Sequence, residues 1–522
     1  MEQPEATDVV VIGGGLSGLC AAVLIAAREP SSRVVVLEAR DRVGGRTVSR
    51  ETAHGALAEL GGAYVGPTQD RVLRVAASLG IGTYKIPCAG KTAFHDAINK
   101  KVLFGSVSFP PLSVAELLDL NALLVRFHNL AEEAVPDPDH PGATDLARKL
   151  DKLSVRAWTI EHARTARIRE FFPPILDTLL CKTADEVSML YCLFCARSGG
   201  SLKRLMDIKN GAQERKFTGG SASISDGLAR RLQDKVRLSH VVEAIDQRRD
   251  DRVTIICRNG AKFSAARVIL ALAPPLYKRI TFQPALPPLK ARIADDFTMG
   301  CIIKTYTYYS RPWWRDAGLS GQVFAPEGPV LCSMDDTKPN GSFPCLMGFV
   351  LADHAKDWAA RTPHERQSAI AAQYALLLHN EEALTPIHYE ECDWNQEEFS
   401  GGCYVASPAI GAFAGSAEAL RAPFDRIYFA GTETALVWAG YMDGAVQAGE
   451  RAALEALASL YPEHYSAPLA SGPPEIQSRE VVARPAVPTV FERVLAKVFD
   501  WVAPLFARSP PIATATATSR DG

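Results

Sequence analysis

The segment Asp8–Gly18 reads DVVVIGGGLSG and decides how this chain folds. Its first five residues, Asp8–Ile12, form a nearly continuous apolar run, which is typical of a strand buried on both faces of a parallel sheet. Gly13, Gly15 and Gly18 follow as G-x-G-x-x-G. The first glycine permits a tight turn, the second lets a pyrophosphate approach the backbone, and the third lets a helix pack closely on the strand. The segment therefore predicts a dinucleotide-binding turn.

The sequence after this turn completes a β-α-β unit. A helix is expected from about Leu16 to Arg28, and Arg33–Ala39, RVVVLEA, is expected to be the second parallel strand. Glu38 lies near the end of that strand, about twenty residues after the last glycine, as the dinucleotide fingerprint requires. Its carboxylate can accept hydrogen bonds from a ribose diol and would repel a 2′-phosphate. A glycine-rich turn in an unrelated α/β protein is the alternative, and it leaves the acid unexplained.

Composition narrows the function further. A chain of 522 residues suggests about two to four domains. Lys plus Arg is 57 against 59 for Asp plus Glu, so no basic field exists to hold nucleic acid. The 11 cysteines are few and unevenly spaced, which favours a reducing compartment over a disulfide framework. The N-terminus lacks the pattern of a secretory signal, and no run of about 18 apolar residues predicts a membrane span.

Further strands and helices are expected in scattered segments. Helical periodicity covers 114–133 and 155–180, separated by a break rich in Pro and Asp. Strand-like runs follow at 237–245, 253–257, 268–272, 302–309 and 426–430. A late helix is expected at 440–457. Elements of one nucleotide-binding domain are therefore expected at 1–88, 212–290 and 388–457. Two insertions, 89–211 and 291–387, are expected to form a second domain.

Six segments carry a resemblance to a known family. They are Asp41–Arg46 (DRVGGR), Gly61–Arg71 (GGAYVGPTQDR), Asn210–Ser225 (NGAQERKFTGGSASIS), Asp335–Pro339 (DDTKP), Phe399–Tyr404 (FSGGCY) and Tyr428–Ala453 (YFAGTETALVWAGYMDGAVQAGERAA). In this order they resemble the animal-type monoamine oxidases of the flavin amine oxidase superfamily. The resemblance implies an α/β (α+β) fold, with a Rossmann-like FAD-binding domain and an inserted substrate-binding domain of the flavin amine oxidase type.

The resemblance implies FAD as the cofactor. Arg46 would help to neutralise its pyrophosphate, and Cys403 would be joined by a thioether to the flavin 8α-carbon. Read from the residues alone, Cys403 could also be a buried free cysteine that acts as a small hydrophobe. The N–H groups of Gly440–Gly444, which open a helix, would face the pyrimidine edge of the isoalloxazine. The expected FAD-binding residues are Gly13, Gly15, Gly18, Glu38, Arg40, Arg46, Gly61, Gly62, Ala63, Tyr64, Val242, Trp394, Cys403, Gly431, Thr432, Glu433, Gly440, Tyr441 and Met442.

Three residues match catalytic positions of the family. Lys304, in the apolar run CIIKTYTYY, would contact flavin N5 through a water and assist oxygen reduction. A strand lysine whose head reaches solvent is the alternative. Tyr404 and Tyr441 would stand face to face before the flavin and aim the amine nitrogen. Without the flanking motifs they would be interpreted as core aromatics.

The expected substrate pocket is apolar with one polar handle, Gln213, as pockets for small ligands usually are. Cys332 departs from the mammalian relatives, which carry a bulkier residue there, so a wider pocket that accepts bulkier amines is a hypothesis. Cys192 and Cys195 lie in an apolar helical run and are expected to pack in the core, and no motif predicts a metal. The expected pocket residues are Tyr64, Leu180, Cys181, Leu205, Met206, Gln213, Cys332, Phe349, Tyr404 and Tyr441.

The implied reaction is FAD-dependent oxidative deamination of primary aryl-alkyl amines. A hydride-type transfer from the neutral amine to flavin N5 gives an imine, water releases aldehyde and ammonia, and O2 is reduced to H2O2. A polyamine oxidase would favour acidic pocket residues, and an L-amino-acid oxidase would favour an Arg clamp. A flavoprotein scaffold without turnover is a third interpretation, which the joint presence of Lys304, Tyr404 and Tyr441 disfavours.

The C-terminal part differs from animal monoamine oxidases, which continue into a membrane helix on the outer mitochondrial membrane. Residues 458–488 are expected to be a linker, 489–508 an amphipathic helix, and 509–522 a disordered tail. Charges at Lys497 and Asp500 interrupt the apolar run. At most a surface-lying helix is expected, and docking on its own or a partner subunit is the alternative. The expected setting is intracellular, cytoplasmic or at the mitochondrial outer membrane surface, and the expected assembly is a homodimer.

Overall fold

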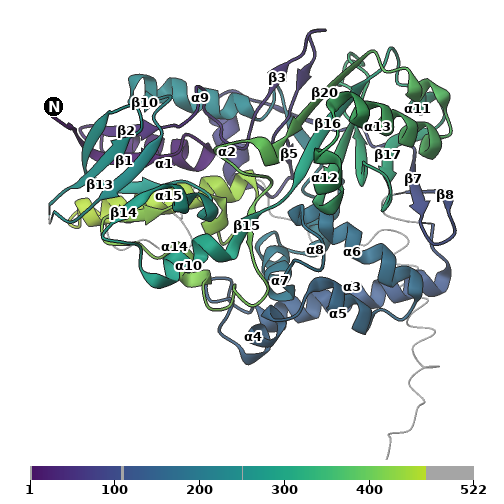
Figure 1. Cartoon of the computed structure of the whole chain (residues 1–522), viewed down its shortest axis with the longest axis horizontal. Helices are drawn as coiled ribbons and strands as arrows, with labels where there is room; N and C mark the ends of the chain where they lie inside the picture. The colour runs from purple at the N-terminus through teal and green to yellow at the C-terminus, as the bar shows by residue number, and fades with distance from the viewer. Residues whose placement is uncertain (1–2, 107–110, 250, 466–522) are drawn as a thin grey trace, which may run out of the picture. The chain divides into compact units, whose positions relative to one another are not determined.

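The computed structural model of the protein describes residues 3–106, 111–249 and 251–465 (Figure 1). The predictions for the amphipathic helix at 489–508, for the tail at 509–522 and for most of the linker lie outside these residues. No helix among the described residues is long and apolar enough to cross a membrane.

An eight-stranded sheet forms around the first strand, β1 (Glu5–Ile12). The strand order is β10-β2-β1-β13-β12-β11-β14, and β22 pairs with β13 in parallel. β1 lies between β2 and β13 and is parallel to both. The other strands are β2 (Val34–Leu37), β10 (Val236–Arg237), β11 (Val242–Asp246), β12 (Val253–Cys257), β13 (Lys262–Leu270), β14 (Thr281–Gln283) and β22 (Ile427–Phe429).

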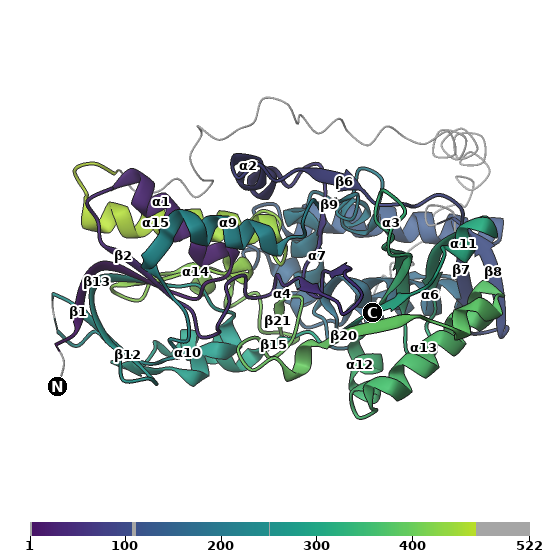
Figure 2. The same cartoon turned by 90° about the horizontal axis from the view of Figure 1, so that it is seen from above.

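Both faces of β1 are buried, as its sequence predicts. Val9 and Val11 pack in a core with the helices α1 (Leu16–Arg28), α9 (Ala222–Leu232) and α15 (Met442–Leu460), which lie along the sheet in Figures 1 and 2. Val10 and Ile12 face a second core, to which η2 (Pro274–Arg279) and α10 (Pro288–Asp296) contribute. The glycine turn is thereby held between two packed layers.

The expected strand at 237–245 is instead two short strands, β10 and β11, with different partners. Between them the backbone turns toward the end of β2, since Ser239 N–H donates to Arg40 O (2.8 Å) and His240 N–H donates to Glu38 O (2.8 Å). The turn therefore packs beside the predicted ribose-binding residue.

A second sheet contains seven strands in the order β20-β16-β19-β18-β17-β7-β8. Its neighbours are antiparallel except for the pair β17 and β7. The strands are β7 (Lys91–Asp96), β8 (Lys101–Gly105), β16 (Ile302–Tyr308), β17 (Leu319–Phe324), β18 (Cys332–Asp335), β19 (Cys345–Leu351) and β20 (His388–Asp393). The helices that accompany them are α11 (Trp313–Asp316), α12 (Ala352–Ala359) and α13 (Pro363–Leu378).

A helical layer lies beside the second sheet in Figure 1. Phe171 of this layer contacts Phe94 and Phe324 of the sheet, with ring centroids 6.3 and 5.6 Å away. The helical periodicity at 155–180 is divided into two helices, because Asp119 accepts hydrogen bonds from the N–H groups of Arg164 and Thr165. The helices are α3 (Val114–Ala134), α4 (Asp145–Asp151), α5 (Val155–His162), α6 (Ala166–Leu180), α7 (Met189–Ser198) and α8 (Leu202–Met206).

Short elements connect these layers. A three-stranded sheet in the order β5-β9-β6 and two-stranded pairs β3–β4 and β15–β21 join segments distant in sequence. Their bounds are β3 (Arg50–Glu51), β4 (Leu57–Ala58), β5 (Tyr64–Val65), β6 (Thr83–Lys85), β9 (Arg215–Phe217), β15 (Phe297–Met299) and β21 (Ala406–Pro408). The remaining helices are α2 (Asp70–Ser78), α14 (Ala417–Arg421), η1 (Gln233–Lys235), η3 (Glu381–Leu384), η4 (Trp394–Gln396) and η5 (Thr432–Thr434).

Candidate active site

The three glycines of the first turn have three different surroundings. Gly13 has φ +106°, which favours glycine. A Cβ at Gly18 would lie 2.0 Å from Gly13 O, so this position must be glycine for α1 to pack on β1. A Cβ at Gly15 would have no described atom within 4 Å apart from its chain neighbours. The open backbone at Gly15, which begins α1 without a side-chain cap, is a cradle suited to a pyrophosphate.

Glu38 lies against this cradle. Its carboxylate is buried and accepts hydrogen bonds from Gly14 N–H (2.7 Å) and from Arg40 N–H (2.9 Å). The Arg40 guanidinium continues to Ser400 Oγ (2.9 Å) and to the Glu397 carboxylate (3.3 Å). The acid at the end of the second strand is thus fixed beside the glycine turn and connected to the segment that precedes Cys403.

Arg46 forms a two-pronged ion pair with Glu433, with N–O distances of 2.6 and 3.1 Å. It also donates to Tyr404 O (2.9 Å), while the same glutamate accepts from Ala406 N–H (3.1 Å). Arg46 therefore joins the second glycine turn to the SGGCY segment and to η5. Its charge is matched by a buried carboxylate, and its expected role toward the pyrophosphate stays a prediction.

The start of α15 is fixed by its neighbours. Gly440 has φ +86°, and Thr432 Oγ1 donates to Tyr441 O (2.8 Å). Tyr441 is the N-cap of α15 and supplies no side-chain cap, so the helix begins at Met442 with uncapped N–H groups. Gly449 approaches α1 so closely that a Cβ there would lie 2.1 Å from Ser17 O. The end of α15 that begins at Met442 is therefore a second place where a partial positive charge is available to a ligand.

Cys403 is 3% exposed and lies beside the glycines of SGGCY. Gly402 has φ +140°, and a Cβ there would lie 2.5 Å from Gly300 O. Burial raises the pKa of the Cys403 thiol to about 12. Trp394 packs in the same apolar cluster and donates its indole N–H to Leu60 O (2.8 Å). All eleven cysteines, Cys192 and Cys195 included, are free, and these two are buried in α7 as predicted.

Lys304 on β16 is buried, so the interpretation of a side chain that reaches solvent is wrong. Its ammonium donates to Glu59 O (2.6 Å) and Gly61 O (2.8 Å). Burial, and next the nearby ammonium of Lys216, lower the pKa of Lys304 to about 8. Lys304 therefore lies directly beside the Gly61–Ala63 segment that is expected to contact the flavin.

The expected pocket residues fall into two neighbouring apolar clusters. The change from one cluster to the other occurs between Leu180 and Cys181, where α6 ends with Cys181 at φ 55°. One cluster contains Leu180, Leu205, Met206 and Tyr441. The other contains Tyr64, Cys181, Cys332, Phe349, Cys403 and Tyr404. The two clusters therefore collect nearly all of the expected residues, although these are widely separated in sequence.

The two tyrosines each rest on another aromatic ring. Tyr404 meets Phe349 edge to face at 6.2 Å, and Tyr441 meets Trp438 at 5.0 Å. Gln213 is anchored by its amide nitrogen, which donates to Leu205 O (3.0 Å). Its buried carbonyl oxygen has no hydrogen-bond partner among the described residues. An unpaired buried acceptor is costly unless a ligand satisfies it, so Gln213 is suited to the role of polar handle.

Val242 and Ala63 are buried structural neighbours of the site. Val242 begins β11 and packs with Ile12 and Leu37 beneath the glycine turn, and Ala63 follows Gly61 and Gly62. Gly62 N–H donates to Arg46 O (3.0 Å), which attaches this segment to the second glycine turn.

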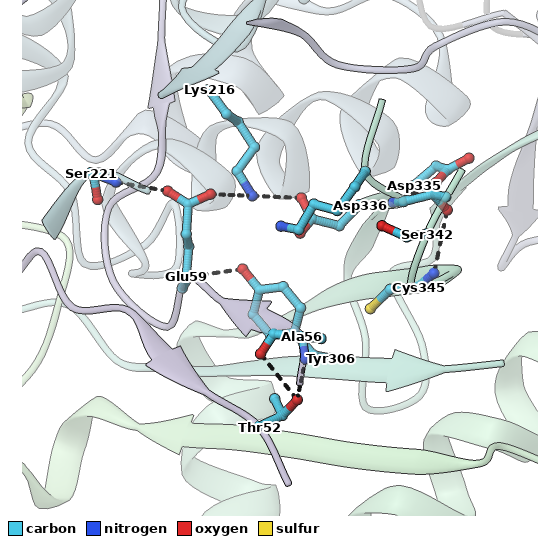
Figure 3. A network of polar contacts seen from close by, with 12 residues as sticks. Thr52, Ala56, Glu59, Lys216, Ser221, Tyr306, Asp335, Asp336, Ser342 and Cys345 are labelled. Atoms are coloured by element: carbon cyan, nitrogen blue, oxygen red, sulfur yellow. Dashed lines mark hydrogen bonds and ion pairs between the residues drawn. The ribbon is translucent and has the colours of Figure 1, made fainter. Parts of the chain in front are cut away.

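Sequence reasoning missed three charged residues that interact with Lys304, namely Glu59, Lys216 and Asp336. Figure 3 shows these three side chains together. All three are buried and joined by ion pairs. The sequence did contain a signal for these three residues, because each of them lies in or next to a segment that resembles the family. Charged side chains in such segments could have been paired by sign, but nothing in the spacing shows which pairs meet.

The residues present fit a flavin dinucleotide. The chain has an open glycine cradle at Gly15, a buried acid, Glu38, beside it, and a helix, α15, that begins without a side-chain cap. These features occur together in proteins that bind FAD through a Rossmann-like domain.

Comparison with known proteins gives the class. A model of the family described as flavin containing amine oxidoreductase matches residues 16–457. The flavin-containing amine oxidase of Danio rerio is 40% identical over 497 residues, which cover 95% of this chain and 93% of that protein. The flavin-containing amine oxidase B of Homo sapiens is 39% identical over 498 residues, covering 94% and 93%.

Solved structures agree. Putrescine oxidase bound to putrescine is similar with a TM-score of 0.83 and 30% identity, covering 87% of this chain and 100% of that chain. Cyclohexylamine oxidase from Brevibacterium oxydans is similar with a TM-score of 0.81 and 30% identity, covering 87% and 99%. The chain belongs to the flavin-containing amine oxidoreductase family. It is an amine oxidase that uses FAD, an amine and O2, as the resemblance predicts.

Proposed function

We propose that the protein oxidatively deaminates primary aryl-alkyl monoamines to aldehyde and ammonia, with release of H2O2. When bound, FAD supplies the two-electron chemistry, taking electrons from the amine and passing them to O2. The observation that carries the proposal is the unpaired Gln213 carbonyl oxygen at an otherwise apolar pair of clusters. Such surroundings suit a slim apolar amine with a single nitrogen to be oriented.

The apolar walls also select the reactive form of the substrate. Burial disfavours an ammonium ion and therefore lowers the pKa of a bound amine. The neutral amine keeps the lone pair that it needs to push electrons toward the α-carbon. In the proposal the amine donates a hydrogen bond to the Gln213 carbonyl, while Tyr404 and Tyr441 orient the nitrogen.

Lys304 would act on the oxygen side of the reaction. An ammonium has three N–H donors, and two are used on Glu59 O and Gly61 O. The third is free among the described residues to hold a water or an oxygen species at the flavin edge. A positive charge there stabilises the negative charge that develops when O2 is reduced.

Substrate class separates this proposal from its alternatives. None of the ten expected pocket residues carries a carboxylate for a second ammonium or a guanidinium for a substrate carboxylate. In a peroxide assay we expect turnover of benzylamine and 2-phenylethylamine and little or none of putrescine or L-amino acids. Faster turnover of putrescine would contradict the monoamine proposal, and peroxide from none of them would favour a scaffold.

Cys332 offers a test of pocket width. It lies on β18 directly across from Phe349 of β19 and is partly exposed. We expect Cys332→Tyr to lower kcat/KM for bulky amines more than for benzylamine, because the ring would extend toward Phe349. An equal loss for all amine sizes would contradict the wide-pocket hypothesis.

We propose that FAD is attached covalently through Cys403. Its burial within the SGGCY segment, in the same apolar cluster as Trp394, supports this site. After acid precipitation, yellow colour should stay with the wild-type protein and leave Cys403→Ala, whereas Cys345→Ala, in the same cluster, should retain it. Release of colour from the wild type would contradict the covalent link. We also propose that the other FAD-binding and pocket residues named in the sequence analysis contact the cofactor and the amine.

The division into FAD-binding and substrate-binding domains, the homodimer and a contact of 489–508 with a membrane are proposed on sequence grounds. The two sheets support the division, although β20, at the start of 388–457, pairs with β16 of the second sheet. Pelleting with anionic liposomes, with and without 489–522, tests the contact, and equal pelleting of both forms would refute it. Organelle fractionation tests a mitochondrial outer membrane against a cytoplasmic setting.

A further inference from the structure

Three buried charges form a chain beside Lys304. The Lys216 ammonium lies 2.6 Å from a carboxylate oxygen of Glu59 and 2.6 Å from one of Asp336. The exposed fractions of the three side chains are 1%, 1% and 4%. Figure 3 shows Lys216 between the two acids. We call these residues the buried ion triple.

The ion triple joins three separate parts of the molecule. Glu59 directly precedes the Leu60–Gly62 segment, Lys216 lies on β9, and Asp336 follows β18 of the second sheet. β9 pairs with β5, which brings Lys216 opposite Tyr64. The triple is therefore placed where the expected flavin-contacting segment meets the second sheet.

Glu59 links the triple directly to Lys304. Its side chain is fixed at both oxygens, because one pairs with Lys216 and the other accepts Ser221 N–H (2.9 Å). Its backbone carbonyl accepts hydrogen bonds from the Lys304 ammonium (2.6 Å) and from the Tyr306 hydroxyl (2.7 Å). A displacement of Glu59 would therefore displace the carbonyl that holds Lys304.

Stability alone does not explain such an arrangement. Removing three charges from water costs several kcal/mol for each ion, and well-packed apolar residues are often as stable as a buried ion pair. A second use of the charges is therefore reasonable. None of the three charges has a proposed role in the reaction, but their neighbour Lys304 has one, in the reduction of oxygen.

The charges that face Lys304 oppose one another. Burial and the Lys216 ammonium favour the neutral amine, whereas the carboxylates of Glu59 and Asp336 favour the ammonium, and the result is a pKa of about 8 for Lys304. The rings of Tyr64, Tyr306 and Phe349 complete its surroundings, with centroids 5.5 to 5.9 Å from Nζ. Lys216 itself keeps a pKa well above its ordinary value, because Asp336 and Glu59 outweigh its burial.

We propose that the buried ion triple Glu59–Lys216–Asp336 is a positioning unit for Lys304, which fixes its ammonium at the flavin edge and sets how readily that group is charged. The inference rests on the proposed function of Lys304 at the flavin. It adds three positioning residues, none of which touches the reacting atoms.

The test compares neighbouring carboxylates. Asp336→Asn removes one charge of the triple, and its amide oxygen can still accept from Lys216. Asp335→Asn is the matched control, because Asp335 is equally buried but pairs with Arg315 (2.6 Å) and Trp314 (2.8 Å) instead. The visible absorption of the oxidised flavin is followed in the holoenzyme between about pH 6 and pH 10, and thermal melting of the same holoenzyme is recorded.

Wild type should show a titration near pH 8, where the pKa of Lys304 lies. Asp336→Asn should lower this apparent pKa by about one pH unit, a tenfold change in the ionisation constant, because a negative charge near the ammonium is lost. The midpoint in Asp335→Asn should move by less than about 0.3 pH units, even if its melting temperature falls as much as that of Asp336→Asn. Lys216→Arg, which keeps the charge, should move the midpoint less than Asp336→Asn does.

Two failures can be told apart with Lys304→Met. If that variant keeps the titration, the placement of Lys304 at the flavin is wrong and the inference fails with it. If it loses the titration, but the two Asp→Asn variants leave the midpoint unchanged or move it equally, only the role of the ion triple is overturned.

Discussion

Two regions border the proposed flavin site, and they use different kinds of residue. At the first turn the chain uses glycines, and the backbone approaches where side chains would obstruct. At the ion triple it uses buried charges, and side chains from three distant segments meet. The glycine turn lies within one segment of the chain, whereas Glu59 and Asp336 are far apart in sequence. The comparison shows that local backbone demands can be recognised from spacing, while long-range charge pairing cannot.

The largest expected effect lies in the charged region. Lys216→Met leaves two carboxylates buried side by side without their cation, and we expect a loss of about 3–5 kcal/mol in the free energy of unfolding. Urea denaturation followed by far-UV circular dichroism measures it. Lys278→Met is the control, because Lys278 pairs with Asp295 at the surface and a loss below about 1 kcal/mol is expected. Similar losses in both variants would remove the distinction between the two kinds of ion pair.

The glycine region can be divided by two substitutions. Gly18→Ala places a methyl group 2.0 Å from Gly13 O, so we expect about 1–3 kcal/mol of destabilisation and poor flavin uptake. Gly15→Ala meets open space at an ordinary φ of −76°, so the flavin-free protein should melt as wild type does, yet bind less flavin. Melting of the flavin-free proteins and the flavin-to-protein absorbance ratio measure both effects. Equal destabilisation by the two substitutions would refute the separate roles of these glycines.

A smaller effect concerns a buried carboxyl outside the ion triple. Burial raises the pKa of Asp177 to about 7. The Asp177 Oδ1 atom has no hydrogen-bond partner among the described residues. The pKa of Asp336, by contrast, lies below its ordinary value despite burial, because the Lys216 ammonium is beside it. The signs are opposite. Asp177 stabilises the fold when protonated, and this contribution is lost as the pH rises from the unfolded pKa through about 7. Asp336 stabilises the fold when ionised, and this contribution is lost as the pH falls.

Denaturation of wild type and Asp177→Asn between about pH 5 and pH 8 tests this difference. Between about pH 6 and pH 8 we expect the variant to lose about 1–2 kcal/mol less than wild type, because it has no carboxyl to ionise. A parallel pH dependence of the two proteins would show that Asp177 does not titrate there.

Much of the first sheet could be predicted from sequence, because its signals are local. The apolar run before Gly13, the helix from Leu16 to Arg28 and the late strand before Gly431 all appear where their patterns indicate. The segment at 237–245 could not be divided in advance. Its break depends on hydrogen bonds to Glu38 and Arg40, which are remote in sequence.

The candidate site shows the same limit. Lys304 was recognisable because an ammonium in an apolar strand is costly without partners. Its actual partners, the backbone carbonyls of Glu59 and Gly61, have no sequence signature. Lys216 and Asp336 stood in segments that resemble the family, but their meeting depends on how the second sheet packs.

The last strand and helix have a consequence for the newly made chain. β22 joins the first sheet by pairing with β13, and α15 reaches α1 through the close approach of Gly449 to Ser17. A ribosome must therefore release nearly all of the described residues before α15 can pack on α1, the helix that follows the cradle at Gly15. Until then the apolar faces of β13 and α1 that await these partners stay uncovered, and a nascent chain of this kind would benefit from a chaperone during synthesis.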